Sequence, residues 1–204
     1  MSRHDRSGPI LIIGGTLSMQ SATMILMRHT AALLEARAMP CEILDAQALE
    51  LPFYHPDLHE KDAPEAAALL AAFRRARAFV WCTPSYHYSI SGRLKNALDF
   101  LELTQDDDPP YLGGRLVGLI AASSGPIAAV QAINAMEQIV HALRGYVVPA
   151  TAPIGPIERA VDRQTGEIAD ARTKLKLTQL VDEMATALRP HPNPPPRGGR
   201  EGRG

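Results

Sequence analysis

Short apolar runs along the chain alternate with stretches in which apolar residues recur every three or four positions. The first run, residues 10–13, is wholly apolar and ends at Gly14 and Gly15, as expected of a strand buried on both faces. Similar runs predict four further strands, at residues 41–44, 78–82, 116–121 and 146–148. Because helical stretches separate these strands, the pattern favours a parallel sheet.

Each intervening stretch carries an apolar stripe at helical spacing. A helix is predicted from about Ser21, Pro64 stands where a helix start tolerates proline, and Ser91 is in position to cap the helix after the third strand. The stripes are Met24, Met27, Ala31 and Leu34; Ala66, Leu69, Leu70 and Phe73; Leu94, Ala97, Leu98 and Leu101; Ala129, Ile133, Met136, Val140 and Leu143; and Leu177, Leu180, Val181, Met184 and Leu188. Strands and helices in this order predict a doubly wound α/β sandwich with helices on both faces of the sheet.

The chain of 204 residues suits one domain, predicted to span residues 1–188. The remaining segment, residues 189–204, reads RPHPNPPPRGGREGRG and has no apolar stripe. Such a segment buries too little surface to offset the entropy lost on ordering, so a disordered tail is predicted.

Composition narrows the functional classes. Lysine and arginine number 21 and aspartate and glutamate 22, so a net charge of −1 offers no overall field for nucleic acid or an acidic membrane. The apolar run PILIIGG is too short for a membrane span or a signal-peptide core. Cys41 and Cys82 both fall in strand-like segments, which predicts buried reduced thiols and a cytoplasmic location.

Ligands of an open parallel sheet bind outside the carboxyl ends of its strands, and three loops of this chain lie there. The first, residues 14–23, carries the hydroxyls of Thr16, Ser18, Ser21 and Thr23 at the start of a helix, which suits a phosphate. It has neither GxGxxG nor GK[ST], so a dinucleotide fingerprint and a phosphate-hydrolysing loop are not indicated. The alternative is that Ser18 or Ser21 only caps the helix.

The second loop, TPSYHYS at residues 83–89, offers flat surfaces through Tyr86 and Tyr88. Pro84 fixes the backbone and leaves neighbouring amides free for a heterocycle. His87 has no carboxylate or thiol at metal-ligand spacing, so a polar contact or a solvated position is predicted, and no metal site. The third loop is SSGP, residues 123–126.

The block PSYHYSISGRLKNALDF resembles the NADPH-dependent FMN reductase family, and the likeness covers roughly residues 9–150. Family members usually show Pro-Glu-Tyr-Asn, a small residue, a serine and a Gly-x-Leu-Lys-Asn-Ala-Leu-Asp helix start. The matching residues are Pro84, Tyr86, Ser89, Gly92, Leu94, Lys95, Asn96, Ala97, Leu98 and Asp99. The resemblance implies a flavodoxin-like three-layer sandwich with strand order 2-1-3-4-5.

The resemblance also implies FMN as cofactor and NADPH or NADH as electron donor. Hydride then passes from the nicotinamide to flavin N5 and on to a quinone, an azo compound, a metal oxyanion or a free flavin. No catalytic side chain is required, because the protein contributes positioning and electrostatics. The implied cofactor-binding residues are Thr16, Ser18, Ser21, Ala22 and Thr23 at the phosphate, and Pro84, Ser85, Tyr86, His87, Tyr88, Ser89, Ser123, Ser124 and Gly125 around the isoalloxazine.

This chain departs from the family at Ser18, where an arginine is usual. A guanidinium there could engage a phosphate, so its absence predicts a weak preference between NADPH and NADH. The family also implies a homodimer or homotetramer formed through the helix after Gly92, and we expect Tyr88 and Phe100 near that contact.

Three alternatives are weighed against this interpretation. An electron-transfer flavodoxin, which is not an enzyme, would usually be more acidic than a net charge of −1. A serine hydrolase lacks support because the chain has no GxSxG sequence. A flavin-fold protein that has lost its cofactor would be colourless when purified.

Overall fold

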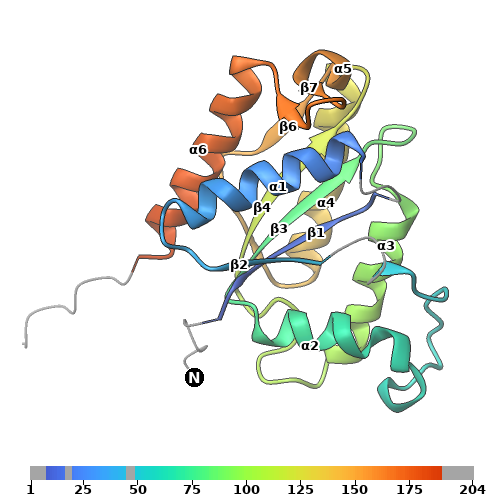
Figure 1. Cartoon of the computed structure of the whole chain (residues 1–204). Helices are drawn as coiled ribbons and strands as arrows, with labels where there is room; N and C mark the ends of the chain where they lie inside the picture. Colours follow the sequence, from blue (N-terminus) through green and yellow to red (C-terminus); the bar gives the residue numbers. More distant parts are fainter. Residues whose placement is uncertain (1–7, 17–19, 45–48, 190–204) are drawn as a thin grey trace, which may run out of the picture.

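The computed structural model describes residues 8–16, 20–44 and 49–189 (Figure 1). Their parallel sheet has the strand order β2-β1-β3-β4-β5. The strands are β1 Ile10–Gly14, β2 Cys41–Leu44, β3 Ala78–Pro84, β4 Leu116–Ala122 and β5 Tyr146–Val147. The predicted flavodoxin-like order is therefore confirmed, and each predicted strand lies within two residues of its observed bounds.

The last strand position is filled by two short segments rather than one. β5 pairs with the first residues of β4, and β6, Ala152–Ile154, pairs with Ile120 to Ala122 farther along the same strand. The prediction of one strand at residues 146–148 missed β6, because three residues including a proline carry too little pattern. This split brings Ile154 beside the carboxyl end of β4, where the third loop begins.

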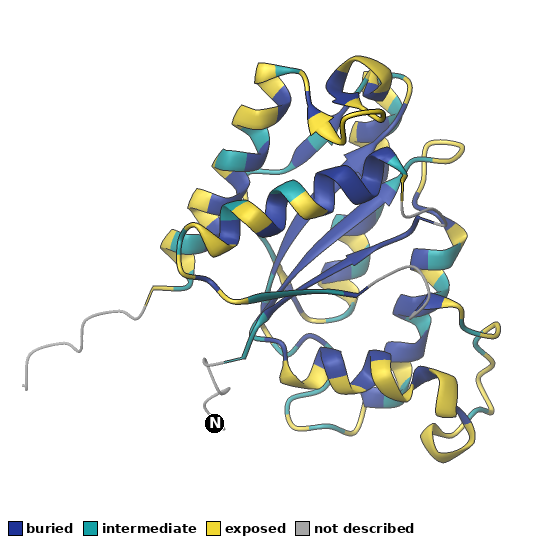
Figure 2. Ribbon diagram, viewed as in Figure 1, coloured by how far each residue is buried: buried dark blue, intermediate teal, exposed yellow. Residues whose placement is uncertain are grey.

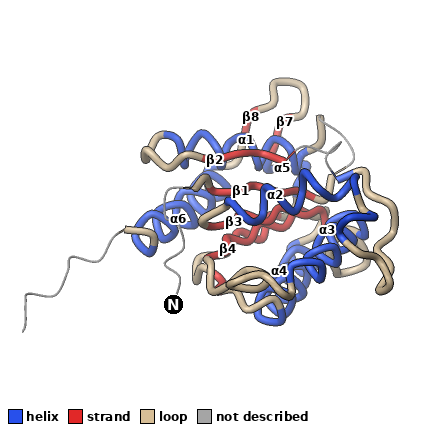
Figure 3. The backbone as a smooth tube through the Cα atoms, turned by 90° about the horizontal axis from the view of Figure 1, so that it is seen from below, coloured by secondary structure: helices blue, strands red, loops and turns tan. Residues whose placement is uncertain are grey.

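Helices cover both faces of the sheet, as Figure 3 shows with the sheet seen from below. The helices α1 Ala22–Glu35 and α6 Ala171–Ala187 pack on one face. The helices α2 Ala67–Arg75, α3 Gly92–Asp99 and α4 Pro126–Ala142 pack on the other. Short 3-10 helices at Glu60–Asp62, Pro64–Ala66 and Phe100–Thr104 border α2 and α3.

Side chains of successive strand residues point to opposite faces of the sheet, as in any pleated strand. Leu11 and Ile13 pack with α2 to α4, whereas Ile10 and Ile12 pack with α1 and α6. Trp81 in β3 is fully buried. Figure 2 shows this dark core running through the central strands of the sheet, with most exposed residues on the outer sides of the helices and in the loops.

A small hairpin follows the sheet and was not predicted. The helix α5 Ile157–Ala160 leads into β7 Val161–Asp162, which pairs antiparallel with β8 Glu167–Ile168. Val161 and Ile168 are buried in the core that α1 and α6 share. Two-residue strands have no detectable alternation, so only their tertiary contacts define them.

The two cysteines are free thiols, but they differ in burial. Cys82 is fully buried, as predicted, and burial raises the pKa of its thiol. Cys41 is only half-buried, so the prediction was wrong for this residue, because β2 is an edge strand. Burial and the nearby Glu35 still raise the pKa of Cys41.

None of the helices in the described ranges is long and apolar enough to cross a membrane. Except for Arg189, the predicted tail lies outside the described residues, so the domain boundary stays a prediction.

Candidate functional site

The three candidate loops leave neighbouring strands at one edge of the sheet. Gly14 of β1 is in register with Cys82 of β3, and Pro84 of β3 is in register with Ala122 of β4. Because all three strands are parallel, their carboxyl ends meet at this edge (Figure 1). The strand order thus brings together residues 14–16, 20–23, 84–89 and 123–125.

In the first loop, the hydroxyl of Ser21 caps helix α1. Its Oγ accepts hydrogen bonds from the backbone N–H of Met24 at 3.1 Å and from Oγ1 of Thr16 at 2.6 Å. Thr16 and Thr23 are buried. Ser21 therefore caps α1, as the alternative expected of it, while Ser18 lies outside the described residues.

The start of α1 still offers donors for an anion. Ala22 and Thr23 are its first two helical residues, and amides at such positions have no partner within the helix. The helix dipole adds a partial positive charge at the same place. A phosphate oxygen could therefore be held by these amides without any cationic side chain.

Gly15 joins the first loop to the second. Its N–H donates to the carbonyl of Cys82 at 3.0 Å. A Cβ at this position would lie 1.8 Å from Oγ of Ser91 and 3.0 Å from its Cβ. Ser91 is the N-cap of α3, as predicted, and accepts from the N–H of Leu94 at 3.3 Å. Only glycine lets the first loop approach the start of α3, directly after the second loop, this closely.

The second loop is a tight hairpin turn. Tyr86 and Ser89 exchange two backbone hydrogen bonds of 3.0 and 2.9 Å. Between them, His87 has φ 49° and Tyr88 has φ 64°, so both central residues are left-handed, as in a type I′ turn. Each such residue other than glycine is strained by about 1–2 kcal/mol.

Both tyrosine rings of this turn are open to solvent. Tyr86 is 59% exposed and Tyr88 61%. Ser85 anchors the turn, because its N–H donates to Ala122 at 2.7 Å and its Oγ donates to the carbonyl of Ala128 at 2.9 Å. His87 is also exposed, which agrees with the predicted solvated position.

The third loop is fixed by its own backbone. The N–H of Ser123 donates to Ile154 at 3.0 Å, and its carbonyl accepts from Ile157 at 2.9 Å. The Ser123 hydroxyl donates to the carbonyl of Gly125. Ser123 is buried and Ser124 is exposed, so Ser124 has the more accessible hydroxyl of the two. A Cβ on Gly155 would come within 2.9 Å of the Gly125 backbone, so glycine is needed there too.

Cationic side chains near the second loop are already paired. Lys95 forms the predicted surface ion pair with Asp99 at 2.5 Å, and Arg93 lies 3.8 Å from Glu50. In the part of the chain that the structure describes, no three His, Cys, Asp or Glu side chains are grouped as metal ligands would be. The site therefore consists of amides, hydroxyls and exposed rings. This donor set fits a flat heterocycle that carries a phosphate.

Residues that the sequence interpretation did not assign also shape the site. Oγ1 of Thr83 accepts from the N–H of Ser91 at 3.0 Å and so closes the second loop. Asn96 accepts from the N–H of Tyr54 at 2.9 Å and donates to the carbonyl of Pro52 at 2.8 Å. Phe53 between them is 92% exposed. Asn96 belongs to the Gly-x-Leu-Lys-Asn-Ala-Leu-Asp motif, and that motif was the one sequence signal that could have indicated its role.

Phe100 corrects one expectation. We expected it near a subunit contact, but its side chain is fully buried, with the Tyr54 ring edge-on at 5.6 Å. Phe100 begins a 3-10 helix after α3, which turns its ring into the core. It cannot form part of an intersubunit surface.

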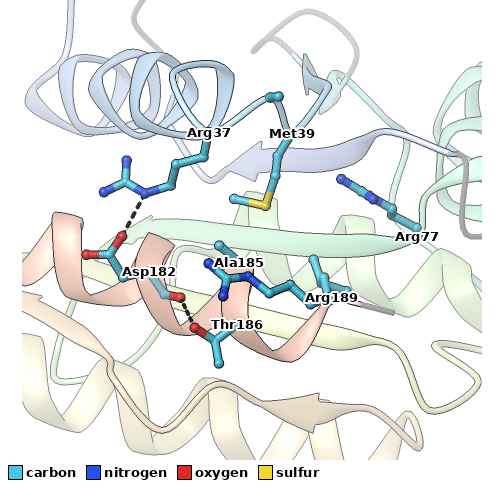
Figure 4. Close-up of a pocket in the computed structure, with 9 residues that line it drawn as sticks. Arg37, Met39, Arg77, Asp182, Ala185, Thr186 and Arg189 are labelled. Atoms are coloured by element: carbon cyan, nitrogen blue, oxygen red, sulfur yellow. Dashed lines mark hydrogen bonds and ion pairs between the residues drawn. The ribbon is translucent and has the colours of Figure 1, made fainter. Parts of the chain in front are cut away.

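A groove lies at the end of the sheet opposite the three candidate loops (Figure 4), and helix capping explains its arginines. Its lining includes Arg37, Arg77 and Arg189, but it lies at the carboxyl ends of α1 and α6. Arg37 donates to the carbonyl of Leu33 at 2.8 Å and to Asp182 at 2.7 Å. Arginines at helix carboxyl ends satisfy terminal carbonyls and the helix dipole, so the groove is no candidate for the phosphate.

Comparison with known proteins shows which family the chain belongs to. The family described as NADPH-dependent FMN reductase matches residues 9–157. The chain belongs to the NADPH-dependent FMN reductase family. It is an NAD(P)H-dependent oxidoreductase that uses FMN, as predicted.

Two named relatives and one solved structure are similar to this chain over most of its length. The NADPH azoreductase of Bacillus sp. (strain OY1-2) is 27% identical over 175 residues, which cover 86% of this chain and 89% of the relative. The quinone reductase of Escherichia coli (strain K12) is 32% identical over 150 residues, covering 72% and 75%. The structure of the NAD(P)H:acceptor oxidoreductase FerB from Paracoccus denitrificans has a TM-score of 0.68 at 24% identity, covering 89% of this chain and 97% of that one, and so shows the shared fold.

Proposed function

We propose that the three loops hold FMN, with its phosphate at the start of α1 and its ring along the second and third loops. The observation that supports this most is the convergence of helix-start amides and two open tyrosine rings at the ends of adjacent strands. The proposed phosphate ligands are Thr16, Ser18, Ser21, Ala22 and Thr23. The proposed ring contacts are Pro84, Ser85, Tyr86, His87, Tyr88, Ser89, Ser123, Ser124 and Gly125.

Bound at these loops, FMN would supply the redox chemistry that connects a nicotinamide hydride donor to an electron acceptor. The residues of this chain would bind and orient the reactants. Quinones and azo compounds are the proposed acceptors, supported by the exposed rings of Tyr86 and Tyr88 and by the names of the azoreductase and quinone reductase relatives. A reducing cytoplasm suits both the free thiols and the nicotinamide donor.

Flavin binding is tested directly by absorbance. The purified protein, incubated with FMN and dialysed, is expected to retain about one FMN per chain and to bleach on anaerobic titration with NADPH or NADH. Thr16→Val removes a hydroxyl at the phosphate site, and we expect FMN affinity to fall about tenfold. Thr186→Val, on exposed α6 surface, is the matched control. A protein that stays colourless contradicts the proposal.

We further propose that two or four copies assemble through the face carrying α3 and the start of α4, with Tyr88 near the rim. Ile127 and Val130 are exposed on α4, and Ser85 connects this helix to the second loop. Exposed apolar side chains on neighbouring elements are typical of a contact between subunits.

The assembly is tested by light scattering at micromolar concentration. Val130→Glu is expected to lower the measured mass to that of a single chain, because a charge would be buried at the contact. Leu175→Glu alters an exposed leucine on α6, on the other face of the sheet, and is expected to leave the mass unchanged. An unmodified protein that is monomeric and fully active would rule out this assembly.

A further inference from the structure

The sequence of the second-loop turn does not suit its backbone. Type I′ turns favour Asn-Gly because both central residues have positive φ. This chain places His87 and Tyr88 there, with φ 49° and 64°. Histidine tolerates the left-handed region better than most residues, whereas a bulky tyrosine is a clear outlier. Tyr88 is thus the more strained of the two.

The turn cannot relax, because its base is fixed on every side. Tyr86 and Ser89 are joined by two hydrogen bonds, and Ser85 is bound to Ala122 and Ala128. Thr83 and Ser91 are joined below them by a further bond of 3.0 Å. The strain at Tyr88 is therefore held by the surrounding structure, as is typical of functional sites.

The Tyr88 side chain contributes little to packing within the chain. With 61% of its surface exposed, it belongs to neither core cluster. Glycine at the same position would remove the strain without opening a cavity. A strained backbone that carries an exposed ring indicates that the ring contacts something outside the chain.

We propose that Tyr88 is a specificity-determining residue whose ring stacks on a flat, conjugated acceptor such as a quinone. This rests on the proposed function, in which the second loop, Tyr88 included, lines the flavin ring. A stacked ring favours planar aromatic acceptors and gives no advantage to a small inorganic acceptor such as ferricyanide. Tyr88 contributes to the choice of acceptor and not to hydride transfer.

The test compares Tyr88→Gly, Tyr88→Leu and Tyr88→Phe in the FMN-loaded protein. The measured quantity is kcat/KM for menadione divided by kcat/KM for ferricyanide, which cancels changes in flavin loading. We expect this ratio to fall about five- to tenfold in the Gly and Leu variants and to be retained in the Phe variant. Calorimetric binding of menadione to the oxidised protein, without nicotinamide, should weaken by the same factor.

Thermal unfolding of the flavin-free variants supplies an independent readout. Tyr88→Gly is expected to raise Tm by about 2–4 °C because it relieves the left-handed strain, whereas Tyr88→Leu keeps the strain and should not. A gain in stability together with a loss of quinone selectivity is the signature of a residue retained for ligand contact.

Other outcomes overturn the inference. An active, yellow protein whose acceptor ratio is the same in all variants overturns this inference alone. A fall of Tyr88→Gly to the mass of one chain would assign the ring to a subunit contact instead. An unmodified protein that binds no FMN overturns the proposed function, and this inference with it.

Discussion

Gly15→Ala is expected to lower the free energy of unfolding by about 2–4 kcal/mol and to weaken FMN binding. The new methyl group would lie 1.8 Å from Oγ of Ser91 and 3.1 Å from Cβ of Leu94. Ser91 would have to rotate and lose its capping bond to Leu94, and the start of α3 would have to shift away from the first loop. Because the two loops form the proposed flavin site together, their separation should reduce affinity as well as stability.

Chemical denaturation and FMN titration measure the two effects. Gly92→Ala is the matched control, since a Cβ at this first residue of α3 meets nothing within 4 Å. It should leave stability unchanged or raise it slightly, because alanine favours a helix over glycine. Equal stability of the two variants would show that the loops are not held in contact by Gly15.

Arg115→Met is expected to lower the free energy of unfolding by about 3–5 kcal/mol. Arg115 is buried, and burial lowers the pKa of its guanidinium to about 10. The side chain donates to four backbone carbonyls, those of Tyr111, Leu112, Phe73 and Ala76, at 2.6 to 2.9 Å. It also stacks on Phe79 with its Cζ 5.0 Å from the ring centre. Methionine would fill the space but remove the guanidinium donors from the carbonyls of Tyr111, Phe73 and Ala76. The carbonyl of Leu112 would still accept from the backbone N–H of residue 115 at 3.0 Å.

Arg74→Met provides the contrast, again by chemical denaturation. Arg74 forms ion pairs with Glu60 at 2.6 Å and with Asp107 at 2.8 Å, but its side chain is 36% exposed. Exposed ion pairs contribute about 0–1 kcal/mol, so this variant should be close to the unmodified protein. If Arg74→Met lowered the free energy of unfolding more than Arg115→Met does, the loss of donors to buried carbonyls would not be the dominant effect.

The strands, the main helices and their order were predictable because burial on one or two faces produces a local period in the sequence. The Ser91 cap and the Lys95–Asp99 ion pair were predictable because each joins residues that are three or four positions apart in the sequence. The three loops could be chosen as candidates because parallel strands end at one edge.

The remaining features depend on contacts between residues far apart in sequence. Gly15 meets Ser91, Gly155 meets Gly125, and Arg115 meets the end of α2, and no local period encodes these pairs. The same holds for Phe100, which turns inward because the helix tightens after Asp99, and for Cys41, which is half-exposed because β2 lies at the edge of the sheet. The sequence by itself determined the sheet, its helices and the loops that carry the chemistry. Only the tertiary structure decided how closely those loops approach and that Tyr88 stands on a strained turn, because both follow from packing across the sheet rather than along the chain.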